Sequence, residues 1–349
     1  MIKKYTLFAF ILLCHFGLEA QQGGSQVFSF LNLSPAGYSH SLGGIMISNA
    51  SNDISTALQN PATLNTETRN AATFNYQFQT AGIGSGSAAY GNHFKKANID
   101  WHAAIQFTDY GNFRGADEWG NETGEFSAGD YAFVFGVAKP LNEQFTIGVN
   151  TKFIYSRLED YIATGIGMDI GGYYMLPTQE ASIGIVAKNM GGVLRSYTGD
   201  GGLLPFDLQV GFTKKLKYLP FRYNITAHHL YKWDVRYSDP NLIATSNAFG
   251  EVDEPSLLAV TADNFFRHLI FGGEFLLGKK ENLKLRFAYN HMLRRELAVQ
   301  NIRSITGFSG GVEFKVKGFF IGYSFGLQHM HGSSKMLSIS TNLGQFKKK

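Results

Sequence analysis

The sequence predicts an all-β fold, a transmembrane antiparallel up-and-down β-barrel of about fourteen strands with an N-terminal hatch or plug segment. Three observations predict it. Apolar and polar residues alternate with a period of two along most of the chain. The alternating segments are even in number, and many have the roughly 9–11 residues that a tilted strand needs to cross a bilayer. Short and long connections follow one another, as in barrels with tight turns at one end and loops at the other.

The first twenty residues have the pattern of a secretory signal peptide. Lys3 and Lys4 give a positive start, an apolar stretch too short to span a bilayer follows, and Ala20 is a small residue before the expected cut. The single cysteine, Cys14, lies inside this stretch, and the bulky Leu13 before it argues against the alternative of a lipoprotein cysteine. Cleavage would leave no thiol, which excludes disulfides, cysteine-ligated zinc and cysteine nucleophiles.

The predicted domains are a signal peptide (1–20), a hatch or plug segment (21–70) and a barrel with long external loops (71–346). The hatch segment does not alternate; it contains Gly43-Gly44, a short helix near 51–58 and an Asn60-Pro61 turn. A fourteen-strand barrel encloses a lumen wider than side chains alone can fill. We therefore expect this segment to fold into the lumen, with a periplasmic location as the alternative.

Fourteen segments of the remaining chain alternate in the manner of strands. In the fifth, for example, Phe145, Ile147 and Val149 alternate with Thr146 and Gly148. The predicted strands are 72–80, 83–91, 101–109, 131–138, 145–156, 165–175, 181–188, 206–214, 221–230, 267–277, 283–292, 307–316, 318–326 and 335–343.

The connections between these strands alternate in length. The short ones, expected in the periplasm, are 139–144, 176–180, 216–220, 278–282 and Lys317-Gly318. The long ones, expected outside the cell, are 110–130, 157–164, 189–205, 231–266 and 293–306.

The two faces of the strands differ in polarity. A Lys or Arg that faces lipid at mid-membrane costs about 2–4 kcal/mol, so charged residues within strands must point into the lumen. We expect this orientation for Lys152, Asp169, Lys188, Glu274, Arg286 and Glu313. A soluble all-β core with one polar face is the alternative, which the signal peptide and the loop asymmetry oppose.

No motif predicts catalysis, a cofactor or a metal. Residues 307–311 match the G-x-S-x-G pattern, but Ser309 begins a strand and would be a lumen-facing hydroxyl. His228 and His229 lie in a predicted strand and should point to opposite faces, and His329 and His331 lack a third ligand. The carboxylates of 109–130 match no calcium motif. With 31 Lys and Arg scattered against 27 Asp and Glu, the sequence predicts no nucleic-acid partner.

Two of the long loops combine aromatic residues with charges, a composition typical of protein interfaces. A cap that packs on itself over the barrel mouth is the alternative. The partner-facing candidates are Tyr110, Phe113, Arg114 and Trp119 in one loop, and Trp233, Tyr237 and Phe249 in the other.

The hatch sequence carries a resemblance to a known superfamily. Leu42-Gly43-Gly44, Asn52-Asp53-Ile54 and Asn60-Pro61-Ala62 resemble the N-terminal hatch of the long-chain fatty-acid transporter barrels. Further segments, taken as an ordered set, are similar to the PorQ family of the type IX secretion system of Bacteroidota. They are 23–31, 109–113, 124–128, 188–191, Leu204-Pro205-Phe206-Asp207, Phe266-Arg267-His268 and Tyr289-Asn290.

This resemblance implies a barrel without enzymatic activity in the outer membrane of a Gram-negative, Bacteroidota-type bacterium. It implies an attachment complex in which the barrel anchors a surface subunit that binds anionic lipopolysaccharide, beside a sortase and a sister barrel. The hatch residues carried over are structural: Gly43, Gly44, Asn60 and Pro61. The alternative is an outer-membrane transporter of hydrophobic small molecules such as fatty acids, an architecture that the superfamily shares.

Overall fold

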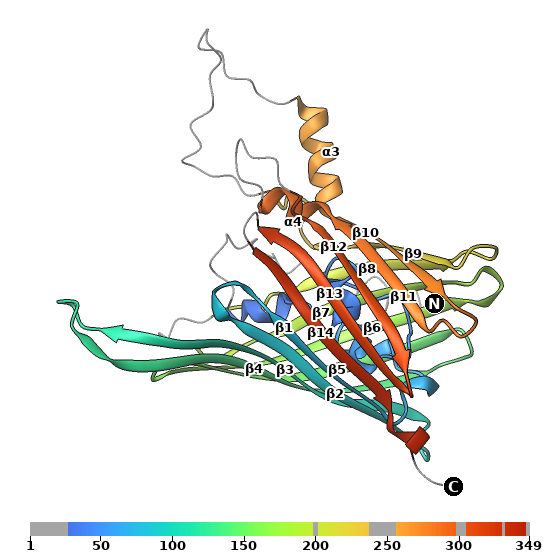
Figure 1. Cartoon of the computed structure of the whole chain (residues 1–349), viewed down its shortest axis with the longest axis horizontal. Coiled ribbons are helices and arrows are strands. Elements are labelled where there is room, and N and C mark those ends of the chain that lie inside the picture. Colours follow the sequence, from blue (N-terminus) through green and yellow to red (C-terminus); the bar gives the residue numbers. More distant parts are fainter. Residues whose placement is uncertain (1–26, 198–201, 237–255, 298–304, 330–331, 347–349) are drawn as a thin grey trace, which may run out of the picture.

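The computed structural model describes residues 27–197, 202–236, 256–297, 305–329 and 332–346, and in them the chain forms a closed β-barrel (Figure 1). Each strand pairs antiparallel with its neighbours in sequence, and β1 closes the barrel against β14, with Ala71 opposite Asn342. The strands are β1 (Ala71–Phe78), β2 (Gly84–Phe94), β3 (Ile99–Ala116), β4 (Glu122–Pro140), β5 (Phe145–Leu158), β6 (Tyr161–Leu176), β7 (Ala181–Arg195), β8 (Asp207–Lys215), β9 (Phe221–Ala227), β10 (Leu269–Leu277), β11 (Leu283–Asn290), β12 (Phe308–Val316), β13 (Phe319–His329) and β14 (Gly332–Asn342).

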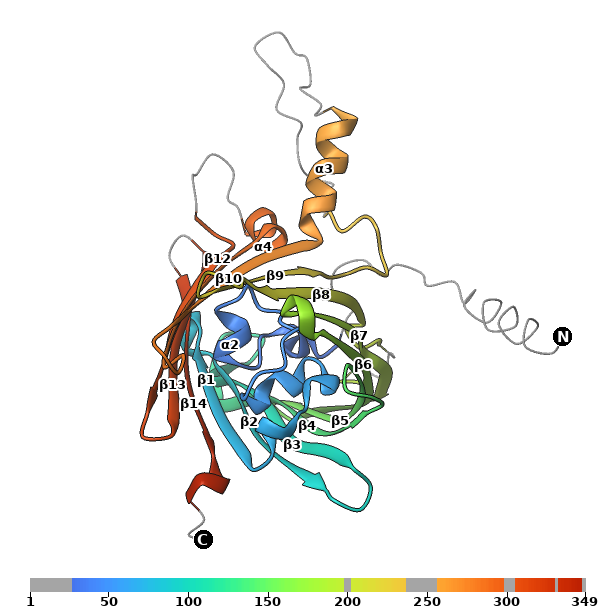
Figure 2. The same cartoon turned by 90° about the vertical axis from the view of Figure 1, so that its right-hand side faces the viewer.

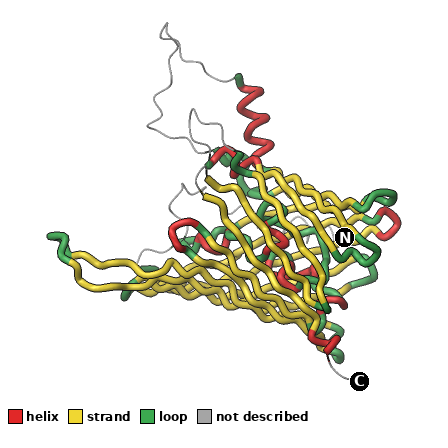
Figure 3. The backbone as a smooth tube through the Cα atoms, in the orientation of Figure 1, coloured by secondary structure: helices red, strands yellow, loops and turns green. Residues whose placement is uncertain are grey.

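Helices are short and few beside this sheet (Figure 3). The α-helices are α2 (Gly37–His40), α3 (Leu257–Arg267) and α4 (His291–Glu296). The 3₁₀ turns are η1 (Ser29–Asn32), η2 (Ile54–Leu58), η3 (Pro61–Thr63), η4 (Thr66–Thr68), η5 (Thr80–Gly82), η6 (Pro177–Gln179) and η7 (Leu343–Phe346). Within the described ranges, no helix is both long and apolar enough to span a bilayer.

The period-two alternation gives the barrel an apolar exterior. Along β4, Tyr131, Phe133 and Phe135 are exposed on the outside, whereas Ala132 and Val134 between them are buried. β6 repeats the pattern with exposed Ile166, Met168 and Ile170. The prediction of a closed antiparallel barrel of fourteen strands is confirmed, and its apolar exterior is the surface expected of a barrel that spans a membrane.

The prediction of a long loop is wrong for two of the connections. Residues 110–130 form the outer halves of β3 and β4, a hairpin closed by the turn at 117–121, and they pair up to Ala116 with Glu122. Residues 157–164 are also strand, with only 159–160 between β5 and β6. Alternation of polarity disappears where both faces of a hairpin meet water, so these extensions had the composition of loops.

Residues 27–70, which we call the luminal segment, lie inside the ring of strands (Figure 2). At one end Phe28, Phe30 and Leu31 pack with Ile154 of β5 and with Leu204, which lies between β7 and β8. At the other end Ile54, Ala57 and Leu64 pack against the small side chains Ala71, Ala89 and Ala138. The predicted signal peptide, 1–20, lies outside the described residues.

Candidate functional site

The luminal segment is attached to the barrel wall by its Asn-Pro turn. The Asn60 side chain caps η3 by accepting from Ala62 N at 3.0 Å, and its Nδ2 donates to Ile47 O at 2.8 Å and to Gly172 O at 3.2 Å. A Cβ on Gly171 of the facing strand would lie 2.0 Å from Asn60 Oδ1. Glycine in β6 therefore leaves the space that the turn occupies.

The Gly-Gly turn makes a second attachment. Gly43 has φ of 88° and Gly44 of 100°, a left-handed backbone that favours glycine. Gly43 N donates to Ser309 Oγ at 3.0 Å, and Asn290 Nδ2 donates to Gly43 O at 3.1 Å. The structure thus places Gly43, Asn60 and Pro61 at contacts between the luminal segment and the wall. Gly44 instead bonds within the segment, to Ser39 O and to the Gln59 side chain.

A network of buried ion pairs lines the lumen on β9 to β12. The Arg286 guanidinium lies between two carboxylates, with Nε 2.7 Å from Glu274 Oε1 and Nη2 2.9 Å from Glu313 Oε2. Lys284 Nζ approaches Glu313 Oε1 at 2.9 Å. The Arg286 Cζ also lies 4.5 Å from the centre of the Tyr38 ring, so the network contacts α2 of the luminal segment.

A second buried pair lies on the opposite wall. Lys152 Nζ is 2.8 Å from Asp169 Oδ1 and donates to Asn189 Oδ1 at 2.7 Å. Asn150 Nδ2 donates both to Asp169 Oδ2, at 3.2 Å, and to Ala57 O of the luminal segment, at 2.9 Å. Buried charges of this kind require partners, and here the wall and the segment supply them together.

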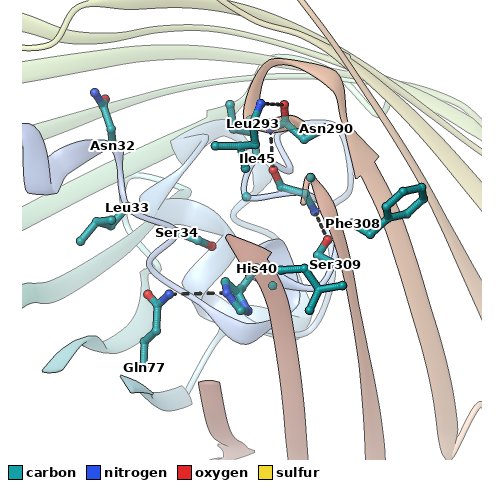
Figure 4. Close-up of a pocket in the computed structure, with 15 residues that line it drawn as sticks. Asn32, Leu33, Ser34, His40, Ile45, Gln77, Asn290, Leu293, Phe308 and Ser309 are labelled. Carbon is teal, nitrogen blue, oxygen red and sulfur yellow. Dashed lines mark hydrogen bonds between the residues drawn. The ribbon is translucent and has the colours of Figure 1, made fainter. Parts of the chain in front are cut away.

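A cavity of about 190 Å³ lies between the luminal segment and β11 to β13 (Figure 4). His40, at its edge, has ring nitrogens 2.9 Å from Ser324 Oγ and 2.8 Å from Ser334 Oγ. Ser309 Oγ, which belongs to the G-x-S-x-G pattern, donates to Ser41 O at 3.3 Å. Leu33, Ile45, Leu293 and Phe308 supply apolar parts of the lining, so the cavity offers both polar and apolar surface.

The predicted partner-facing residues of the first loop lie on the β3–β4 hairpin. Tyr110 donates its hydroxyl to Asp130 Oδ2 at 2.7 Å, and the ring of Phe113 stacks on that of Phe126. Arg114 approaches Glu122 at 3.5 Å with both side chains in water, and Trp119 at the tip is 83% exposed. Figure 1 shows the hairpin projecting far beyond the rest of the barrel.

Residues of the second loop lie around α3. Trp233 stacks on His268 with ring centres 5.5 Å apart. An apolar groove is formed by Trp233, Leu257, Leu258, Thr261, Ala262, Phe265 and Phe266, which we call the α3 groove. Tyr237 and Phe249 lie outside the described residues. Both views place α3 well away from the hairpin, so the structure does not bring the two sets of candidates together.

α3 is held to α4 through one carboxylate. Asp263 Oδ2 accepts from Arg267 Nε at 2.8 Å, and its Oδ1 accepts from His291 Nε2 at 2.9 Å and from Arg295 Nε at 2.5 Å. Partial burial alone would raise the pKa of Asp263, but these three donors outweigh it and lower the pKa to about 2. Asp263 and Arg267 are four residues apart, a spacing that helical ion pairs use, but His291 and Arg295 are distant in the chain and the sequence offered no signal for them.

The prediction for His228 and His229 is wrong. β9 ends at Ala227, and His229 adopts φ of 55°, so the chain turns out of the sheet. The two rings converge, with their Nδ1 atoms 2.6 Å apart, instead of pointing to opposite faces. The His331 residue and the His329 side chain lie outside the described part of the structure.

Two solved structures of similar fold are, by their titles, a hydrocarbon channel and a toluene transporter. The monoaromatic hydrocarbon channel CymD matches with a TM-score of 0.50 and 14% identity, over 90% of this chain and 97% of that chain. The Pseudomonas putida toluene transporter TodX matches with a TM-score of 0.50 and 13% identity, over 88% of this chain and 97% of that chain. At such identities the likeness shows the fold. No family model and no curated protein sequence matches the chain.

Proposed function

We propose that this protein is an outer-membrane barrel that anchors a surface partner and has no enzymatic activity. Following the resemblance of its sequence, the assembly is the attachment complex of the type IX secretion system, and the partner is the subunit that binds lipopolysaccharide. The observation that carries the proposal is the α3 groove, where Leu257 is 86% and Leu258 81% exposed. Exposed apolar groups gathered in one patch mark interaction sites.

The interior supports the same proposal. The luminal segment is bonded to the wall at Gly43 and Asn60, and buried ion pairs of the wall contact it at Tyr38 and Ala57. Moving this segment would remove the Tyr38 ring from Arg286 and would break the hydrogen bonds of Asn150 with Ala57 and of Asn60 with Gly172, which leaves buried polar groups without these partners. The barrel is therefore suited to holding external elements in place.

Affinity purification from detergent-solubilised outer membranes tests the proposal. The tagged wild type should recover the lipopolysaccharide-binding subunit, identified by mass spectrometry, and L257S/L258S should recover at least tenfold less. L219S is the matched control, because Leu219 is also exposed but lies in the 216–220 turn at the other end of the barrel. If L257S/L258S recovers as much partner as the wild type, the interface is not the α3 groove. If the tagged wild type is purified without the partner, the anchoring role is refuted.

A second candidate function is transport of hydrophobic small molecules such as fatty acids. The comparison with solved structures favours this candidate, since both neighbours are hydrocarbon channels or transporters by title. The cavity beside His40 and Ser309 offers a binding place of about 190 Å³. Uptake of a labelled fatty acid by a deletion strain, with and without the wild-type gene restored, tests it; unchanged uptake would refute this function.

A further inference from the structure

Three metal-ligating side chains meet where β8 begins and β9 ends. Asp207 is the first residue of β8, and His228 and His229 directly follow β9. Each offers one ligand atom, and these atoms lie within 4.8 Å of one another. Within the described ranges, this is the one group of three or more His, Cys, Asp or Glu side chains with such an arrangement.

The local backbone produces the convergence. Consecutive residues of a strand point to opposite faces, but the left-handed backbone of His229, with φ of 55°, turns its ring toward that of His228. Asp207 Oδ1 accepts from His229 N at 2.7 Å, which fixes the carboxylate against the turn. Asp207 Oδ2 accepts from Gln209 Nε2 at 2.6 Å and lies 4.0 Å from His229 Nδ1.

The cluster is buried and incompletely paired. His228 is 2% exposed and Asp207 is 6% exposed. The two Nδ1 atoms lie 2.6 Å apart, closer than most N–H···N contacts, and His228 Nε2 has no hydrogen-bond partner. An orphaned buried nitrogen needs an explanation, and the two Nδ1 atoms approach each other beside the Asp207 carboxylate, as two ligands of one cation would.

We infer that Asp207, His228 and His229 form a Zn²⁺ site, with a fourth position for water. In tetrahedral zinc sites with metal–nitrogen distances near 2.0–2.1 Å, ligand atoms are about 3.3 Å apart. The separations of 2.6 Å and 4.0 Å lie on either side of this value, and all three ligand atoms lie within 4.8 Å of one another, so rotations of the side chains would bring them to tetrahedral separations. Two imidazoles with a single carboxylate select Zn²⁺ over Mg²⁺ and Ca²⁺, which prefer oxygen ligands.

A bound cation would restrain residues 228–233, the segment that contains Trp233. His268 is not a ligand, because its Nδ1 and Nε2 face His228 O at 2.8 Å and Trp233 O at 2.9 Å. These contacts connect residues 228–233 to the start of β10. A cation at the site would add a link from the same segment to β8, and so hold one wall of the α3 groove.

Isothermal titration of the chelator-treated, full-length mature protein in detergent tests the inference, with ZnCl₂ in the syringe. We expect one Zn²⁺ per chain, no heat of binding with MgCl₂ or CaCl₂, and an X-ray absorption spectrum with nitrogen and oxygen ligands. D207N and H229Q should each weaken binding at least tenfold. H93Q is the matched control, because His93 also faces a carboxylate, at 2.8 Å from Asp100, but lies on the far end of β2.

Three results would overturn the inference. The first is a wild type that binds no Zn²⁺ at one-to-one stoichiometry. The second is equal Zn²⁺ affinity in the wild type and in both variants, once heat-modifiable migration shows that the variants are folded barrels. The third is an equal loss of affinity in H93Q, which would place the zinc site at Asp100. These results measure Zn²⁺ binding alone, whereas recovery of the surface partner measures the proposed function, so failure of one is distinguishable from failure of the other.

Discussion

The lumen and the external rim distribute polar and apolar side chains in opposite ways. In the lumen, Arg286, Asp169 and Lys152 are buried, and each has charged or amide partners. At the rim, Leu257 and Trp119 are largely exposed to solvent. Paired groups in the lumen fix the position of the luminal segment, whereas unpaired apolar groups at the rim are free to be covered. From this difference we expect substitutions in the lumen to lower the stability of the barrel and substitutions at the rim to lower recovery of the partner.

The largest effect is expected from R286M. The substitution leaves Glu274 and Glu313 buried without the Arg286 guanidinium, and breaking a buried ion pair from one side costs about 3–5 kcal/mol. The temperature at which the barrel loses its heat-modifiable migration should fall clearly. The carboxylates then keep only Arg222 and Lys284 as charged partners; no change in R286M would contradict the role given to the network.

A smaller effect is expected from G171V. The new Cβ would overlap Asn60 Oδ1, and overpacking of this kind costs typically about 1–3 kcal/mol. We expect the Asn60 turn to leave the wall and single-channel conductance in planar bilayers to rise. G192V is the control, since the space beside Gly192 in β7 is open. Equal conductance in wild type and G171V would show that this contact does not hold the luminal segment in place.

A third prediction concerns the pH dependence of α3. The lowered pKa of Asp263, about 2 against an ordinary value near 3.9, means that its stabilising effect is complete above pH 4 and is lost as the pH falls toward 2. A spin label on L257C should have the same mobility at pH 7 and 5 and should become more mobile at pH 3.

D263N provides the comparison for this titration. It replaces a charged acceptor of three hydrogen bonds, and loss of such a bond costs about 1.5–3 kcal/mol. The label should be mobile in D263N at every pH. Increased mobility of the wild type already between pH 7 and 5 would assign the titration to another group.

The smallest effect is expected from R114M on the β3–β4 hairpin. Arg114 and Glu122 are 79% and 74% exposed and 3.5 Å apart, and exposed pairs contribute about 0–1 kcal/mol. The apparent melting temperature should match that of the wild type within error. A loss comparable to that of R286M would remove the distinction between lumen and rim.

The sequence predicts the strands well because each crosses an apolar band, and a residue on the wrong face is costly. Lys152, Asp169 and Arg286 could be assigned to the lumen for that reason. Their partners could not be predicted, since they depend on how strands are staggered around the barrel and on where the luminal segment lies. Asn150, which bonds both Asp169 and Ala57, is an example.

Outside the apolar band, alternation of apolar and polar residues no longer indicates strands. Residues 110–130 pair as strands although both of their faces meet water, so alternation did not mark them. The convergence of His228 with His229 depends on a left-handed backbone at a residue other than glycine, which composition does not indicate. The partner-facing roles of Tyr110, Phe113 and Trp233 remain predictions.

The most direct test of the anchoring role is a gene deletion with two readouts, surface display of secreted cargo and uptake of labelled fatty acid. We predict that the deletion strain loses display, that uptake is unchanged, and that the wild-type gene restores display while L257S/L258S does not. Loss of uptake with display intact would contradict the anchoring role and would establish the transporter in its place.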